Sequence, residues 1–81
     1  MRKPQTYGYS ITFPAETTET EAKRILSNLN LPMPHVLERF GASPLFAHYI
    51  DIDMGAFLVL KIALDDGTIK KHRLHVVFFT N

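Results

Sequence analysis

Two histidines in the stretch HRLH, His72 and His75, are the side chains of this chain best suited to acid–base chemistry near neutral pH. With Lys71 and Arg73 to hold a phosphate, they would supply the groups that a metal-independent ribonuclease needs. Histidines three residues apart share a face on a helix and can bind a metal ion there, whereas on a strand they point to opposite faces. Because the segment is predicted to be a strand, we expect no metal site in it.

Two further combinations involve His48. With Asp51 and Asp53 it could form an oxygen-rich cation site if residues 48–53 were a loop, but on a strand the two aspartates share the face opposite His48. Ser43, His48 and Asp51 are the residue types of a hydrolase triad, and no nucleophile-elbow motif accompanies them. We therefore predict neither a catalytic site nor a metal site.

Residues 61–73 form a basic segment that could contact phosphates, as a β-ribbon does in some nucleic-acid-binding proteins. The net charge of the whole chain is only +1, whereas phosphate binding usually requires a clear cationic excess. Four aspartates and one lysine give residues 51–66 a charge of −3, and three cations give residues 68–81 a charge of +3. Such a distribution is typical of neighbouring strands whose charges compensate one another.

The composition is that of a soluble globular protein, with 46% hydrophobic and 21% charged residues. The absence of cysteine excludes disulfides, thiolate catalysis and cysteine-based zinc sites. The longest apolar stretch, AFLVLKIAL, is interrupted by Lys61 and is shorter than the ~20 residues of a membrane span. The N-terminus lacks the apolar run of a secretory signal. We expect a single domain over residues 1–81, located in the cytoplasm, with no cofactor and no membrane association.

The first part of the chain is predicted to form a strand and then a helix. Residues 7–13, YGYSITF, alternate between large and small side chains, which is typical of a half-exposed strand. Thr18 and Glu21 have the spacing of a helix capping box, and Pro32 ends the helix near Asn30. The apolar stripe of this helix comprises Ala22, Ile25, Leu26 and Leu29.

The middle of the chain carries weaker signals. Residues 31–44 are predicted to form a short second helix, because Pro34 suits its first turn and Gly41 suits its C-terminal cap. For residues 45–53, LFAHYIDID, Ser43-Pro44 could begin a helical turn, whereas the alternation of side chains favours a strand. The strand is the preferred interpretation.

Residues 56–64 and 68–80 flank the sequence LDDGT, which predicts a β-hairpin. Of the two possible registers, we favour the one with a bulge at Gly67 and Leu58 opposite Leu74. It gathers the apolar side chains on one face of the hairpin, and a slip by one residue would disperse them.

The predicted fold is therefore α+β, with the order β-α-(short α)-β-β-β and one four-stranded, mainly antiparallel sheet with helices packed on one face. The first strand is expected to pair with the last. This order resembles that of the small ribonuclease toxins of bacterial toxin–antitoxin pairs, which implies RNA cleavage by a histidine and basic residues on the sheet. None of their local sequence motifs occurs here, so no family is assigned.

The predicted function is that of a small non-enzymatic binding or regulatory module, an inhibitor or accessory factor, acting through a protein partner or as a homodimer. Two short helices can cover only one side of the sheet, which leaves an apolar face to contact a partner. The predicted contact residues form an apolar centre and a basic rim: Phe57, Val59, Val77 and Phe79, with Lys61, Lys71 and Arg73. The alternatives are a metal-independent ribonuclease of the small toxin type and a nucleic-acid-binding module that uses the basic hairpin 61–73.

Overall fold

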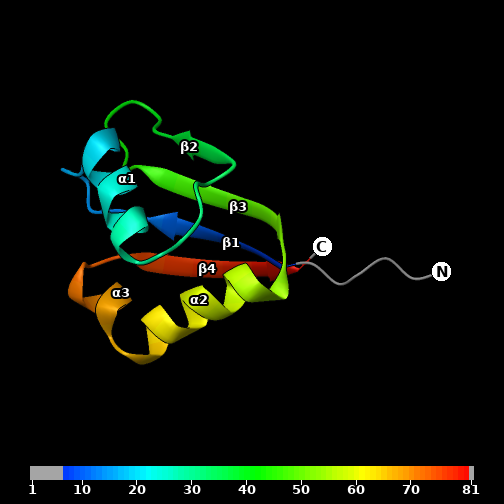
Figure 1. Ribbon diagram of the computed structural model, residues 1–81. Coiled ribbons are helices and arrows are strands. Elements are labelled where there is room, and N and C mark those ends of the chain that lie inside the picture. Colours follow the sequence, from blue (N-terminus) through cyan, green and yellow to red (C-terminus); the bar gives the residue numbers. More distant parts are fainter. Residues whose placement is uncertain (1–6, 81) are drawn as a thin grey trace.

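The computed structural model of the 81-residue chain describes residues 7–80 (Figure 1). Within them, the strands are β1 (Tyr7–Thr12), β2 (Val36–Glu38), β3 (Phe46–Ile52) and β4 (His75–Thr80). The helices are α1 (Glu19–Asn28), α2 (Met54–Asp65) and the single turn α3 (Thr68–Lys71). The strands form one antiparallel sheet in the order β2-β3-β1-β4.

The α+β class, the four-stranded antiparallel sheet and the pairing of the first strand with the last are confirmed. Apart from α3, the elements follow the order β-α-β-β-α-β of the ferredoxin-like arrangement. Both long helices lie against the same face of the sheet (Figure 1). Every second residue of the two central strands points into this core, where Tyr9, Ile11, Ala47 and Tyr49 meet Ala22 and Leu26 of α1 and Leu60 and Ala63 of α2.

The local signals that define α1 and β3 are also confirmed. The Thr18 hydroxyl accepts a hydrogen bond from the backbone N–H of Glu21 at 3.2 Å and caps α1. Residues 45–53, for which the strand was the preferred interpretation, contain β3.

The predicted short helix over residues 31–44 is wrong, because β2 lies in that segment. Leu31 and Met33 each precede a proline, which disfavours helical backbone at both positions. The chain continues extended and Val36 pairs with His48 of β3. The side chain of Arg39 then reaches back to donate hydrogen bonds to the carbonyl oxygens of Ala15 and Thr17.

The predicted hairpin is also wrong, because its first strand is the helix α2. Asp53 caps this helix by accepting a hydrogen bond from the N–H of Ala56 at 2.9 Å. Almost every residue of the segment is apolar, so it satisfies strand alternation and helical spacing equally well. Gly67, with φ of 81°, joins α2 to α3 instead of forming a hairpin bulge, and the predicted pairing of Leu58 with Leu74 does not occur.

Two tyrosines at the centre of the core differ in the environment of their hydroxyl groups. Their rings stack with centroids 4.6 Å apart, and the Tyr49 hydroxyl donates a hydrogen bond to the carbonyl oxygen of Pro32 at 2.6 Å. The Tyr9 hydroxyl is buried and has no hydrogen-bond partner within residues 7–80. One hydroxyl therefore stabilises the fold, whereas the other is desolvated without compensation.

Replacing each tyrosine by phenylalanine is expected to have different effects on the free energy of unfolding. Tyr49→Phe should lower the free energy of unfolding by about 1–2 kcal/mol, because it leaves the Pro32 carbonyl unpaired. Tyr9→Phe should leave that free energy unchanged or raise it, because it removes an unpaired buried hydroxyl. Urea denaturation of both variants measures the difference, and equal losses would contradict this description of the core.

Candidate functional site

The face of the sheet opposite the helices, here called the open face, carries the side chains that alternate with the core residues. No helix within residues 7–80 covers it. Strand pairing assigns its members: Ser10 and Thr12 of β1, Val36 and Glu38 of β2, Phe46, His48 and Ile50 of β3, and His75, Val77 and Phe79 of β4.

Large apolar side chains are exposed on this face. Val36 and Ile50 are each 40% exposed, and Val77 is 51% exposed. Phe79, at 39% exposed, lies opposite Gly8, and its ring occupies the space above that glycine. A Cβ atom on Gly8 would lie 2.3 Å from a ring carbon, so the glycine permits this close approach. The aromatic ring thus covers backbone that would otherwise be exposed.

A hydrogen-bonded chain of three side chains lies at the centre of the open face. The Ser10 hydroxyl is 2.8 Å from Nδ1 of His48, and Nε2 of His48 is 2.9 Å from a carboxylate oxygen of Glu38. Because an ionised carboxylate can only accept, the ring nitrogen beside Glu38 carries the hydrogen, and in the neutral imidazole Nδ1 then accepts from the Ser10 hydroxyl. Direct pairing of Ser10 with His48, and of Val36 with His48, holds the three strands in register.

This chain of groups has the proton-transfer order of a serine hydrolase triad, with the roles of the two ring nitrogens exchanged. Acyl transfer also needs N–H donors placed for the oxyanion. Ser10 lies in the middle of β1, between β3 and β4, so its backbone is committed to the sheet and offers no such donor. The geometry favours a satisfied polar cluster within an apolar surface over a catalytic site.

The structure divides the seven predicted contact residues among different surfaces. Val77 and Phe79 lie on the open face, but Phe57, Val59 and Lys61 belong to α2 on the other side of the sheet. The prediction that all of them form one patch is therefore wrong.

The remaining predicted residues are separated from the open face as well. The ring of Phe57 stacks on Tyr7 with centroids 4.4 Å apart, so it belongs to the core side. Lys71 ends α3, and the guanidinium of Arg73 bonds to Glu16 at 2.7 Å.

The predicted catalytic and metal-binding combinations are not assembled either. The HRLH stretch spans the end of α3 and the start of β4, with His72 at the C-cap of the helix. His48 contacts Ser10 and Glu38 rather than Ser43. Within residues 7–80, no group of three or more histidine, cysteine or acidic side chains could hold a metal ion. No helix in the same part of the chain is long and apolar enough to cross a membrane.

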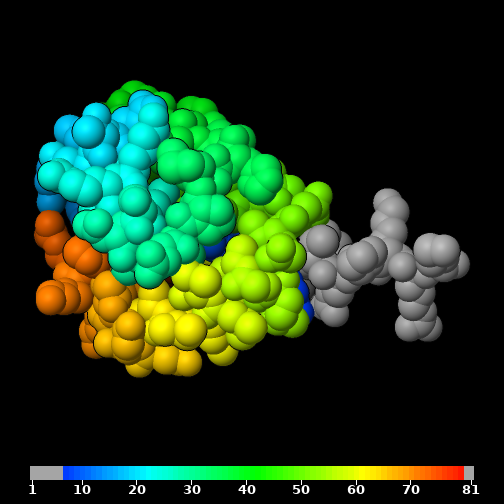
Figure 2. Space-filling model, in the orientation of Figure 1, coloured from blue at the N-terminus to red at the C-terminus, as the bar shows by residue number. Residues whose placement is uncertain are grey.

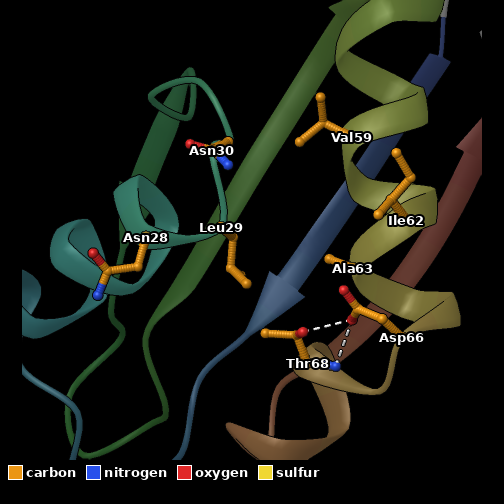
Figure 3. A pocket seen from close by; sticks show the side chains of 8 residues that line it. All are labelled: Asn28, Leu29, Asn30, Val59, Ile62, Ala63, Asp66 and Thr68. Atoms are coloured by element: carbon orange, nitrogen blue, oxygen red, sulfur yellow. Dashed lines mark hydrogen bonds between the residues drawn. The ribbon is translucent and has the colours of Figure 1, made fainter.

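Grooves on the helical side follow the seam between α1 and α2 (Figure 2). The first has a volume of about 270 Å³, and its lining includes Leu29, Val59 and Ile62 (Figure 3). Its carboxylate, Asp66, accepts hydrogen bonds from the hydroxyl and the N–H of Thr68, and these bonds hold the pKa of Asp66 below its usual value. The Asp66 carboxylate therefore stabilises the first residue of α3 and is already hydrogen-bonded within the chain.

Ser10 and Glu38 could not be recognised as neighbours from the sequence, because residues 36–38 were predicted to be helical. Once β2 is known to be a strand, the alternation of side chains and the strand register together place Ser10, His48 and Glu38 on one face. The element order alone does not indicate a function, since unrelated proteins share it. Comparison of the chain with protein-family models, with curated proteins and with solved structures finds no significant match.

Proposed function

We propose that this protein is a small non-enzymatic binding or regulatory module whose open face contacts a partner protein. The observation that carries the proposal is the set of half-exposed apolar side chains on that face, Val36, Phe46, Ile50, Val77 and Phe79. Large apolar side chains gathered on one exposed face mark interaction sites on soluble proteins. The polar groups at its centre are already hydrogen-bonded to one another, so covering them costs less desolvation energy than covering unpaired polar groups would.

The distribution of charge favours a protein over a nucleic acid as the partner. Proteins that bind single-stranded nucleic acids place aromatic rings and cations on the same surface. Here the rings of Phe46 and Phe79 lie on the open face, whose ionisable members are Glu38, His48 and His75. The lysines of α2 and α3 belong to helices on the other side of the sheet. The same separation disfavours the ribonuclease alternative. A cytoplasmic location remains part of the proposal.

Affinity capture with matched variants tests the proposal. Ile50→Lys adds a charge to a residue of the open face that is 40% exposed, and the control Leu58→Lys adds one to a residue of α2 that is 49% exposed. Immobilised wild type and the Leu58→Lys variant should retain the same protein from a lysate of the source cells, with or without ribonuclease treatment. Ile50→Lys should lose it while keeping its circular dichroism spectrum.

Three outcomes would overturn the proposal. Binding that survives Ile50→Lys would place the contact elsewhere, and binding that disappears after ribonuclease treatment would indicate a nucleic acid. Retention of the same proteins by all three baits and by the empty resin would mean that the open face binds nothing specific.

A further inference from the structure

The strand β4 combines two properties that conflict in a single chain. It lies at the edge of the sheet, where its only described neighbour is β1. Its sequence, HVVFFT, is apolar on both faces, as in strands that lie inside a sheet and are covered on both sides. Val77 remains 51% exposed and Phe78 48% exposed, so the rest of residues 7–80 does not provide that cover.

The edge also lacks the features that normally prevent strands from associating. Soluble proteins protect their edge strands with lysine or other charges, proline, bulges or short length. The other edge strand, β2, is three residues long and carries Glu38. In contrast, β4 is six residues long, contains neither a proline nor an acidic or basic residue other than His75, and pairs with β1 without a register shift.

The backbone groups that face outward from this edge can be identified from the register. Phe13 donates its N–H to the carbonyl oxygen of Leu45, so odd-numbered residues of β1 bond towards β3 and even-numbered residues bond towards β4. Val77 and Phe79 lie opposite Ser10 and Gly8 and are therefore bonded to β1. The N–H and C=O groups of the alternate residues, Val76 and Phe78, point away from the sheet.

Among residues 7–80, charged side chains of opposite sign lie at the levels of the two ends of β4. Lys70 and Arg73 precede β4 and line a groove of about 460 Å³ beside the edge, together with Leu64, Val76 and Phe78. At the far end, Thr80 and Ile52 both lie beside Tyr7, so the Asp51–Asp53 segment is at the level where β4 ends. A two-fold antiparallel pairing would bring Lys70 and Arg73 of one copy to the level of the Asp51–Asp53 segment of the other, which lies two strands in from the paired edge, at both ends of the contact.

We propose that β4 pairs edge to edge with β4 of a second copy of this chain, which joins the two sheets into one of eight strands. Pairing satisfies the outward backbone groups of Val76 and Phe78 and encloses the apolar side chains of a strand that has the composition of a central one. The charge pattern favours a second copy over a peptide from another protein, because antiparallel pairing sets the basic segment before β4 of each copy at the level of the acidic Asp51–Asp53 segment of the other. This inference concerns the edge of the sheet and does not depend on the partner proposed for the open face, although it would set two open faces side by side.

Sedimentation velocity and light scattering test the association. Wild type should approach twice the 9.2 kDa chain mass as its concentration rises. Val77→Lys places two like charges close to the two-fold axis and should weaken self-association at least about tenfold. The matched control Ile50→Lys changes the same face, but on a strand that has neighbours on both sides, and should remain a dimer. A monomeric wild type, or a dimer that Val77→Lys does not weaken, would overturn the proposal.

Hydrogen exchange of the wild type tests the geometry without relying on any variant. The amides of Val76 and Phe78 should be protected at least about tenfold more in the dimer than at concentrations where the chain is monomeric. The amides of Val77 and Phe79, which bond to β1, should be protected under both conditions. A dimer in which Val76 and Phe78 exchange as fast as in the monomer would show that another surface makes the contact. If the Ile50→Lys variant loses the partner protein but remains a dimer, the open face binds the partner and the β4 edge makes the dimer independently of it.

Discussion

Leu60→Ala is expected to lower the free energy of unfolding by about 2–5 kcal/mol, because it leaves a cavity in the centre of the core. Leu60 is 0% exposed and packs among the buried residues beneath α2. Leu58, two residues earlier, is 49% exposed on the outer side of the same helix. Leu58→Ala should therefore change the free energy by less than about 1 kcal/mol. Urea denaturation measures both changes in the free energy of unfolding, provided that the m-value is the same in the two variants and in wild type.

This pair of leucines distinguishes the two conformations that the segment could adopt. On a strand, Leu58 and Leu60 would share one face and both would be buried or both exposed. On a helix they are 200° apart, so only one of them can face the sheet. Equal losses of stability in the two alanine variants would favour the predicted hairpin and contradict the helix α2.

Raising the pH above about 10 is expected to destabilise the protein steeply. Tyr9 and Tyr49 are both 0% exposed. Burial raises the pKa of each phenol well above its ordinary value, and the proximity of Tyr9 raises the pKa of Tyr49 further. The unfolded chain releases these protons near pH 10, about the pKa of free tyrosine, whereas the folded chain retains them.

The sign of the effect follows from this difference in bound protons. Below about pH 10 both states hold the protons and the stabilisation is complete. Above it the folded state binds more protons than the unfolded state, so each tyrosine removes about 1.4 kcal/mol from the free energy of unfolding per pH unit. Two tyrosines together give a slope of about 2.7 kcal/mol per unit, until the protein unfolds or the pH passes the raised pKa values.

Urea midpoints measured between about pH 8 and about pH 12 give this slope, and absorbance at the phenolate band shows whether the tyrosines ionise together with unfolding. Tyr9→Phe should reduce the tyrosine contribution to the slope by half. The double variant Tyr9→Phe, Tyr49→Phe should retain only the dependence that comes from other groups. A double variant as sensitive to alkali as wild type would mean that these phenols are accessible to solvent in the folded state.

Local signals in the sequence determined several elements of this fold. The strict alternation in YGYSITF defines β1, because large side chains at every second position can all face one core. Thr18 and Glu21 locate the start of α1, since a side-chain cap acts over three residues and needs no tertiary contact. The β3 strand could be predicted for the same reason as β1. These elements, with the pairing of the first and last strands, were enough to predict the α+β class and the four-stranded sheet.

Tertiary structure decided the rest. Residues 54–65 are apolar at nearly every position, and packing against the sheet, together with the Asp53 cap, selects a helix in which Leu60 and Ala63 are buried. The helix in turn moves Phe57 away from Val77, which divides the predicted contact surface. Ser10, Glu38 and His48 come from three strands and meet only through the register of the sheet. The apolar composition of β4 is visible in the sequence, but its place at the edge follows from the strand order. Strand order depends on contacts between distant segments, and no local pattern of side chains encodes it.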